Sequence, residues 1–154
     1  MTVELAHAPD IDALVELRLA FLEADHGPLG ADAAAALADA LPAYYRAHLD
    51  RDLFCYVTRT GDGIAACAFL LVVEKPPSPA FMTGRTGTVL NVYTRPEYRR
   101  RGIARRVMQR LIEDARAMDI CTMNLRATDA GYPLYRSVGF VDDVNKYHSM
   151  KWNR

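Results

Sequence analysis

The run from Val92 to Ala104, VYTRPEYRRRGIA, constrains the fold of this chain more than any other stretch. It starts as the end of an apolar, β-branched segment, residues 88–93, which is typical of a buried strand. Pro96 ends that strand, and an amphipathic helical pattern begins directly after Gly102. The sequence therefore predicts a strand, a tight turn and a helix in immediate succession.

The predicted turn is suited to binding an anion. Backbone N–H groups at the start of a helix have no intrahelical partner, and the helix dipole favours negative charge there. Gly102 lets the main chain approach a ligand closely, and the arginines at 99–101 add positive charge. Seven arginines fall within residues 95–110, with Glu97 as the only acid before the helix. We expect this basic patch to bind a small phosphorylated ligand.

Two segments resemble a known protein family. Residues 99–104, RRRGIA, match the (Arg/Gln)-x-x-Gly-x-(Gly/Ala) signature of the GNAT superfamily, the acetyl-CoA-dependent N-acetyltransferases. Residues 133–140, PLYRSVGF, resemble the family's Leu-Tyr-x-x-x-Gly-Phe segment. The two motifs occur in the family's order and at a plausible spacing, so the chain is identified as resembling this family over most of its length.

The resemblance implies an α/β fold with a mixed, mostly antiparallel central sheet of about six to seven strands, flanked by about four helices. The apolar patterning agrees with this fold. It predicts strands at 2–6, 54–58, 64–73, 88–93, 122–128 and 147–152, and helices at 9–26, 32–51, 103–115 and through 135. A length of 154 residues with 51% hydrophobic content predicts a single N-acetyltransferase domain over residues 1–154.

The resemblance also implies roles for individual residues. Tyr135 matches the family tyrosine that protonates the thiolate leaving group, which suits a phenol with an ordinary pKa of about 10. The backbone N–H of Tyr93 is implied as the oxyanion donor, in a sheet that splays beside this strand. Residues implied to contact acetyl-CoA are Val92, Tyr93, Thr94, Arg99, Arg100, Arg101, Gly102, Ile103 and Ala104. No metal is expected, because no histidine has a partner at metal-ligand spacing.

The general base is not identified by the resemblance. Many family members place a glutamate on the strand before the turn, whereas residues 88–92 include no carboxylate. A water relay could replace that glutamate. The side chains that could replace it are those of Glu23, Asp25, His26, Glu74 and Asp129.

The expected activity is transfer of an acetyl group from acetyl-CoA to a primary amine of a small-molecule acceptor by direct attack. Two alternatives stay open. The acceptor could be an amine of a protein or peptide, or the chain could be a sensor that binds acetyl-CoA without turnover, as the missing glutamate would allow. Glu23, Asp25 and Asp32 lie near the junction of the first two predicted helices and suit a cationic acceptor.

Composition disfavours several other classes of protein. Nineteen basic and nineteen acidic side chains cancel, and no nucleic-acid-binding motif accompanies the arginines, so no nucleic-acid partner is expected. No apolar run approaches the roughly 20 residues of a membrane span, no signal peptide is recognised, and three cysteines make no disulfide framework. We therefore expect a cytoplasmic protein without membrane contact. The resemblance leaves a homodimer open and identifies no interface.

Overall fold

The computed structural model describes residues 1–154 and contains one five-stranded sheet in the order β1-β2-β3-β4-β5. The strands are β1 (Val3–Leu5), β2 (Leu53–Thr60), β3 (Gly63–Glu74), β4 (Arg85–Thr94) and β5 (Thr122–Asn124). Neighbouring strands pair antiparallel, except that β5 runs parallel to β4. The parallel pair is joined through a helix, as parallel neighbours require.

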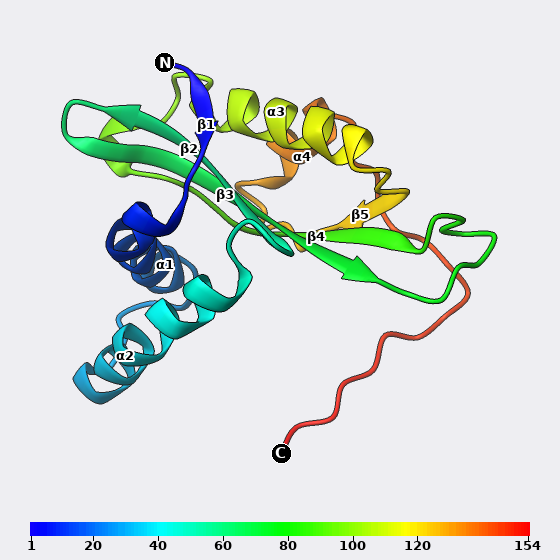
Figure 1. The fold of residues 1–154 in the computed structure, drawn as a ribbon, viewed down its shortest axis with the longest axis horizontal. Coiled ribbons are helices and arrows are strands. Elements are labelled where there is room, and N and C mark those ends of the chain that lie inside the picture. Colours follow the sequence, from blue (N-terminus) through cyan, green and yellow to red (C-terminus); the bar gives the residue numbers. More distant parts are fainter.

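Helices cover both faces of the sheet (Figure 1). Helices α1 (Ile11–His26) and α2 (Ala31–His48) lie on one face, and α3 (Ile103–Ala117) and α4 (Tyr132–Ser137) lie on the other. Short 3₁₀ turns, η1 (Ala8–Asp10) and η2 (Pro96–Tyr98), precede α1 and α3. This arrangement confirms the predicted α/β class, with four helices around a mixed sheet.

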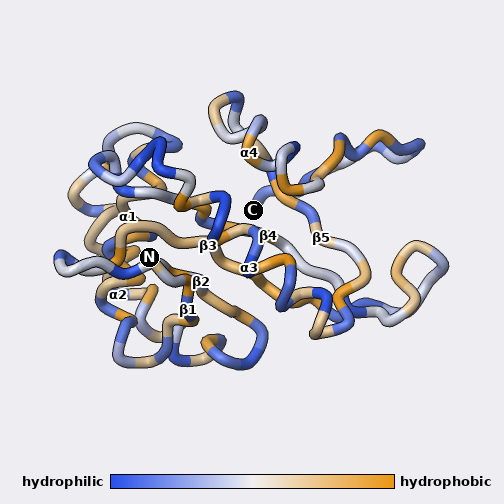
Figure 2. Tube along the Cα trace, turned by 90° about the horizontal axis from the view of Figure 1, so that it is seen from above, coloured by the Kyte–Doolittle hydropathy of each residue, from blue (hydrophilic) through white to orange (hydrophobic).

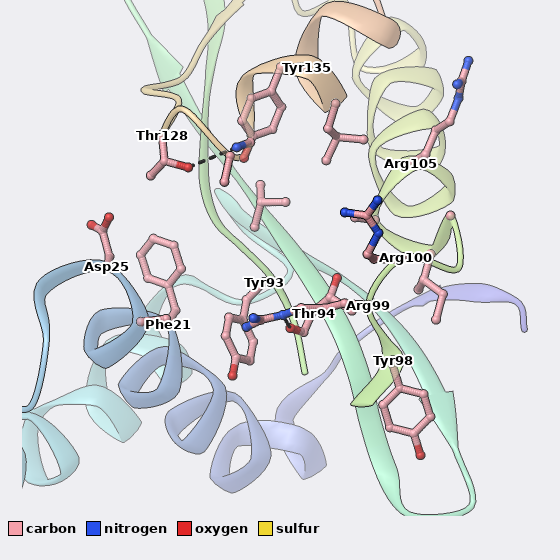
Figure 3. Close-up of a pocket in the computed structure, with 18 residues that line it drawn as sticks. Phe21, Asp25, Tyr93, Thr94, Tyr98, Arg99, Arg100, Arg105, Thr128 and Tyr135 are labelled. Atoms are coloured by element: carbon pink, nitrogen blue, oxygen red, sulfur yellow. Dashed lines mark hydrogen bonds between the residues drawn. The ribbon is translucent and has the colours of Figure 1, made fainter. Parts of the chain in front are cut away.

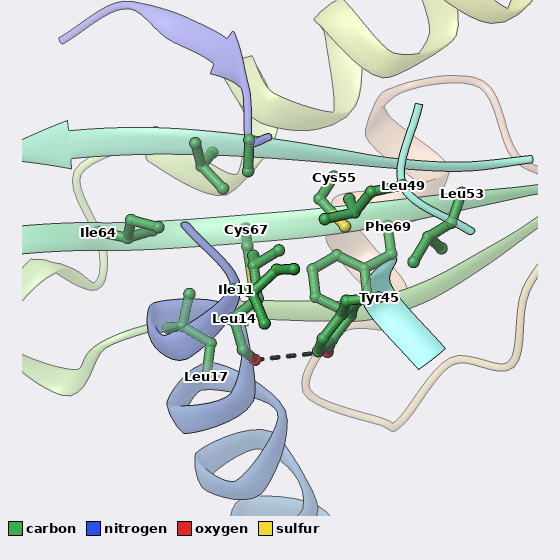
Figure 4. Close-up of a cluster of buried hydrophobic side chains, with 12 residues drawn as sticks. Ile11, Leu14, Leu17, Tyr45, Leu49, Leu53, Cys55, Ile64, Cys67 and Phe69 are labelled. Carbon is green, nitrogen blue, oxygen red and sulfur yellow. Dashed lines mark hydrogen bonds between the residues drawn. The ribbon is translucent and has the colours of Figure 1, made fainter. Parts of the chain in front are cut away.

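The core on the α1–α2 face is built around aromatic and branched side chains (Figure 4). Leu14 and Leu17 of α1 are fully buried, and Tyr45 of α2 is 1% exposed. The Tyr45 ring meets Phe69 of β3 edge to face, with ring centroids 6.1 Å apart. Its hydroxyl donates a hydrogen bond to the Leu14 carbonyl at 3.4 Å, so the phenol is buried with its polar end satisfied.

The core on the opposite face is supplied mainly by α3. Val107, Leu111 and Ala115 recur every four residues and pack against the sheet, where Tyr56 and Leu70 are also buried. Full burial of each larger side chain contributes about 1.5–3 kcal/mol to stability. Hydropathy along the chain alternates between apolar and hydrophilic in this helix (Figure 2). The α3 start is therefore fixed against the sheet, which positions the turn that precedes it.

Three predictions about strands were wrong. The sheet has five strands rather than six to seven, and the expected fifth strand, residues 122–128, is limited to Thr122–Asn124. The expected last strand, Tyr147–Trp152, forms no regular structure and runs as an extended arm away from the sheet. Alternating apolar residues produce a strand only where a second backbone offers hydrogen bonds, and this arm has none beside it.

Candidate active site

The turn between β4 and α3 leaves a row of backbone donors free. Gly102 caps α3 with a φ of 71°, and Arg100 has a φ of 61°, so the chain reverses sharply at both positions. None of the N–H groups from Arg100 to Arg105 donates a hydrogen bond within the protein, and the first to do so is that of Arg106, to the Gly102 carbonyl at 3.3 Å. These donors lie at the positive end of the α3 dipole, where an anion is stabilised.

The three arginines of the turn point in different directions. Arg99 donates from Nε to the Thr94 carbonyl at 2.9 Å, and its guanidinium lies 5.8 Å from the centre of the Tyr93 ring. Arg101 turns back, donates to the Glu97 carbonyl at 2.9 Å and lies over the Tyr98 ring. Arg100 makes no ion pair or hydrogen bond within the protein. Its charge is therefore the one most available to a ligand.

A cavity of about 740 Å³ lies between this turn, the end of α1 and the start of α4 (Figure 3). Of the residues predicted to contact acetyl-CoA, the cavity is lined by Val92, Tyr93, Thr94, Arg99, Arg100, Gly102, Ile103 and Ala104. Tyr135 lines it as well. Arg101 is the one member of the predicted set that does not line the cavity. The structure thus brings together residues that are more than thirty positions apart in the sequence.

Several lining residues were missed by the sequence analysis. They are Phe21, Ala24, Tyr98, Arg105, Thr128, Ala130, Gly131 and Leu134. Phe21 and Ala24 belong to the exposed end of an ordinary amphipathic helix, and nothing in the sequence separates them from core residues. Gly131 and Thr128 lie just before the second motif, where Gly131 N–H donates to Thr128 Oγ1 at 3.1 Å. Their position just before that motif was the one sequence feature that could have predicted them as lining residues.

The sheet opens along the cavity. Strand β5 pairs with β4 only from Thr86–Thr122 to Thr88–Asn124, and beyond this point the two chains are unpaired. Strand β4 also carries a bulge: Leu90 pairs with Phe69 and Tyr93 with Cys67, which leaves one extra residue on β4. The splay that the family resemblance implied is therefore present, and it leaves one edge of β4 available to a ligand.

Strand alternation decides which N–H groups face this opening. Arg95 N–H donates to the Ala65 carbonyl at 2.9 Å, so it points toward β3. Tyr93, two residues earlier, points its N–H the same way, and Thr94 between them points its N–H toward the opening. The geometry therefore favours Thr94 over Tyr93 as a main-chain donor to a group bound beside β4.

Tyr135 is held at the cavity wall by packing. Its ring lies edge to face with Phe140, with centroids 6.3 Å apart, and burial raises the pKa of its phenol. Gly131 passes so close that a β-carbon there would come within 3.1 Å of Tyr135 Cε2. A larger residue at position 131 would therefore press on the Tyr135 ring, and the phenol stays protonated throughout the neutral pH range.

Asp25 is the only acid that lines the cavity. It extends from the end of α1 on the side that faces Thr128 (Figure 3), and its Oδ2 lies 3.3 Å from Nε2 of His26. The other side chains that could replace the missing glutamate, Glu23, His26, Glu74 and Asp129, do not line it. The structure therefore separates Asp25 from the other candidates that the sequence left open.

A family model described as the acetyltransferase (GNAT) family matches residues 12–140. The chain belongs to this family and is an acetyltransferase, with acyl transfer from acetyl-CoA as its class of reaction. This confirms the resemblance found in residues 99–104 and 133–140. No curated protein matches the chain.

Solved structures agree with this assignment. A predicted acetyltransferase from Clostridium acetobutylicum, crystallised with acetyl-CoA, is 27% identical with a TM-score of 0.82, over 97% of this chain and 95% of that one. A GCN5-related N-acetyltransferase from Ralstonia eutropha JMP134 is 26% identical with a TM-score of 0.80, over 97% of each chain. A glucosamine-6-phosphate N-acetyltransferase from Arabidopsis thaliana, 16% identical with a TM-score of 0.69 over 97% of each chain, shares the fold. No helix of the structure is both long and apolar enough to span a bilayer.

Proposed function

We propose that this protein, acting as a single domain over residues 1–154, transfers the acetyl group of acetyl-CoA to a primary amine of a small, cationic acceptor. One observation carries the proposal: a single cavity joins the free N–H groups of the turn before α3, the opened edge of β4, Tyr135 and Asp25. A phosphate site, a thioester site, an acid and an amine-binding carboxylate are what this reaction requires in one place.

The turn before α3 fits the pyrophosphate of coenzyme A. Its unpaired N–H groups and the free guanidinium of Arg100 supply donors and positive charge, and no protein atom lies within 4 Å of a β-carbon built on Gly102. Arg99, bonded to the Thr94 carbonyl, keeps a second charge beside the strand. We place the pantetheine arm along the edge of β4 at Val92 to Thr94, with the Thr94 N–H as donor to the thioester oxygen.

The reaction needs one proton removed and one supplied. The acceptor nitrogen attacks the acetyl carbonyl, so that the new C–N bond forms as the C–S bond breaks and the electron pair leaves on sulfur. Tyr135, kept protonated by burial, donates its proton to that thiolate. The proton lost by the amine passes to Asp25, directly or through water, because no other acid lines the cavity.

Asp25 also favours an acceptor that carries positive charge. Its carboxylate has no arginine or lysine partner in the structure, and only His26 lies within ion-pair distance. Phe21, one helical turn earlier, adds an apolar wall to the cavity. An ammonium group with a short apolar segment matches these two side chains, as in a polyamine or an aminoglycoside.

The test is calorimetric titration with acetyl-CoA, followed by a thiol-release assay on the same sample with polyamines, aminoglycosides, amino acids and peptides. Micromolar binding with turnover on a small cationic amine is the expected result. Turnover only on a peptide amine would contradict the small-molecule acceptor. Binding without any turnover would favour a sensor. No binding of acetyl-CoA would contradict the assignment of the turn before α3 as the pyrophosphate site.

The role of Asp25 is tested by Asp25→Asn, with Asp12→Asn as the matched control on the exposed face of the same helix. We expect Asp25→Asn to raise KM for the cationic acceptor about tenfold or more, since a hydrogen bond to a charged group contributes roughly 1.5–3 kcal/mol. It should also lower kcat, because the group that takes the amine proton is lost, and it should leave the Kd for acetyl-CoA unchanged. Asp12→Asn should change none of these constants. Equal acceptor KM values for the two variants would exclude Asp25 from acceptor binding.

A further inference from the structure

Arg18 on α1 is a half-buried cation that has no carboxylate partner. Three arginines of the chain are half-buried, namely Arg18, Arg85 and Arg95, and a glutamate lies at ion-pair distance from each of the other two. Arg18 makes a single hydrogen bond, from Nη1 to Oδ1 of Asn91 at 3.2 Å. A guanidinium has five N–H donors, and a partly desolvated charge without a counter-ion is costly. The free donors of Arg18 therefore indicate a negatively charged partner from outside the chain.

Arg18 borders the cavity of the candidate active site. Its guanidinium carbon is 5.8 Å from the centre of the Phe21 ring, and Phe21 lines the cavity one helical turn further along α1. Its hydrogen bond to Asn91 holds it against the bulge of β4, and the next residue of that strand, Val92, lines the cavity as well. The guanidinium is thus within reach of a molecule that occupies the cavity beside Phe21.

A second donor lies near Arg18. Tyr44 of α2 is 37% exposed, and its hydroxyl makes no hydrogen bond within the protein. Burial is the main cause that raises the pKa of this phenol, and the positive charge of Arg18 opposes the rise, so the two groups are close enough to interact. One guanidinium and one hydroxyl match a carboxylate, which accepts hydrogen bonds from both and carries a single charge. A phosphate monoester carries nearly twice that charge.

The spacing along α1 limits the length of the acceptor. Arg18 and Asp25 are seven residues apart on this helix, which is about two turns and about 10 Å along one face. Phe21 lies between them on the side of α1 that faces the cavity (Figure 3). A molecule that reaches both charges needs its carboxylate and its ammonium group at opposite ends of an apolar chain. The α-amine of an amino acid is too close to its carboxylate, whereas the side-chain amine of lysine or ornithine is several carbons away.

We propose that the acceptor is a small amino acid whose reacting amine ends its side chain, with its carboxylate bound by Arg18 and that amine at Asp25. With an α-amine as well, as in lysine or ornithine, such a molecule keeps a net positive charge at neutral pH. This inference rests on the proposed function and narrows its acceptor from small cationic amines to diamino acids. Arg18 then determines which acceptor binds and takes no part in the proton transfers.

The test compares lysine with cadaverine, which differs from it only by the missing carboxylate, in the thiol-release assay. For the unmodified protein we expect kcat/KM to be about tenfold or more higher for lysine, because a hydrogen-bonded charge pair is lost with cadaverine. Arg18→Gln should abolish this preference, and Arg46→Gln, at an exposed position on α2, should retain it. If Arg18 only supports the bulge of β4, Arg18→Gln will lower both kcat/KM values in parallel and leave their ratio unchanged, which would overturn the proposal.

A second measurement separates this inference from the proposed function. Calorimetric titration of lysine and of cadaverine into the protein saturated with coenzyme A needs no turnover. Tighter binding of lysine, lost in Arg18→Gln, is expected and would support the carboxylate site even if no acetyl transfer were detected. Equal binding of the two amines, or binding of neither, would overturn it.

Two further results of the assay would contradict the carboxylate site while leaving the acetyltransferase in place. The first is turnover of cadaverine and spermidine without a preference for lysine. The second is a preference for glucosamine 6-phosphate over glucosamine that has no counterpart between lysine and cadaverine, since it would assign Arg18 to a phosphate. The position of the acetyl group on lysine tests the spacing, because a product acetylated on the α-amine would contradict it.

Discussion

Arg18 on α1 donates from Nη1 to Oδ1 of Asn91 on β4, 3.2 Å away, and so ties the helix to the bulge in the strand. Asn91 is 2% exposed and has a φ of 52°, in the left-handed region that asparagine tolerates better than most residues. Its Nδ2 lies 3.5 Å from Sγ of Cys67 on β3. One side chain thus holds α1, β3 and β4 together directly beside the opened edge.

Two substitutions of Asn91 should measure separately the free-energy cost of the left-handed backbone and the stabilisation that the amide hydrogen bonds provide. We expect Asn91→Gly to lower the free energy of unfolding by about 1–2 kcal/mol, because the hydrogen bonds are lost while φ stays allowed. Asn91→Val loses the same hydrogen bonds and also places a β-branched residue at a left-handed φ. It should therefore lower the free energy of unfolding by about 1–2 kcal/mol more than Asn91→Gly does. Urea denaturation of both variants measures the difference. Equal stabilities would mean that the bulge relaxes when Asn91 is replaced.

Gly102→Ala should weaken acetyl-CoA binding more than it weakens the fold. The added methyl meets no protein atom within 4 Å, and a φ of 71° costs a non-glycine residue about 1–2 kcal/mol. We expect the Kd for acetyl-CoA, measured by calorimetry, to rise tenfold or more, since the methyl occupies the approach to the free N–H groups. Gly63→Ala in the β2–β3 hairpin, with a φ of 109°, carries similar strain and should leave that Kd unchanged. Similar Kd values for the two variants would count against the turn as the phosphate site.

Tyr135→Phe should lower kcat by about 10²–10⁴-fold and leave the Kd for acetyl-CoA near its original value, because only the proton donor is removed. Tyr132→Phe, on the same helix but exposed, is the control and should retain activity. The pKa of Tyr135 is raised by burial, so the phenol stays protonated as the pH passes its ordinary value of 10.0. The kcat of the unmodified protein should therefore show no loss from Tyr135 below that pH. A Tyr135→Phe variant with full kcat would exclude this acid.

Alkaline pH should destabilise the fold through Cys67. Burial raises the pKa of this thiol from its ordinary value of 9.0 to about 12, although the Asn91 amide opposes the shift. Between those two values the unfolded chain has lost the proton and the folded chain keeps it, so the free energy of unfolding falls as pH rises, by about 1.4 kcal/mol per pH unit for one proton. Cys67→Ala should make this slope shallower in urea denaturation between pH 9 and 11, and the buried Cys55 thiol, whose pKa is also raised by burial, should account for part of the slope that remains. An unchanged slope would mean that groups other than Cys67 cause the loss of stability in this pH range.

Local chemistry made part of the site predictable. The strand, turn and helix of residues 88–115 are specified by near neighbours: β-branched residues, then Pro96, then Gly102, then an apolar stripe every four residues. The structure places β4, the turn and α3 there. Tyr135 could be found only through the resemblance of its motif, because a half-buried tyrosine after a glycine has no local signature. Arg101 could not be told apart from Arg99 and Arg100, since its direction depends on the Glu97 carbonyl and the Tyr98 ring.

The sequence by itself determined the class of fold, the tight turn between β4 and α3 and the family, because each follows from periodicity, turn chemistry or a short motif. Only the tertiary structure decided that Asp25, at the end of α1, shares a cavity with Arg100 and Tyr135. It also decided that the sheet ends at β5 and that residues 147–152 leave it. Both outcomes depend on which backbones and side chains meet across long stretches of chain, and no pattern within one segment contains that information.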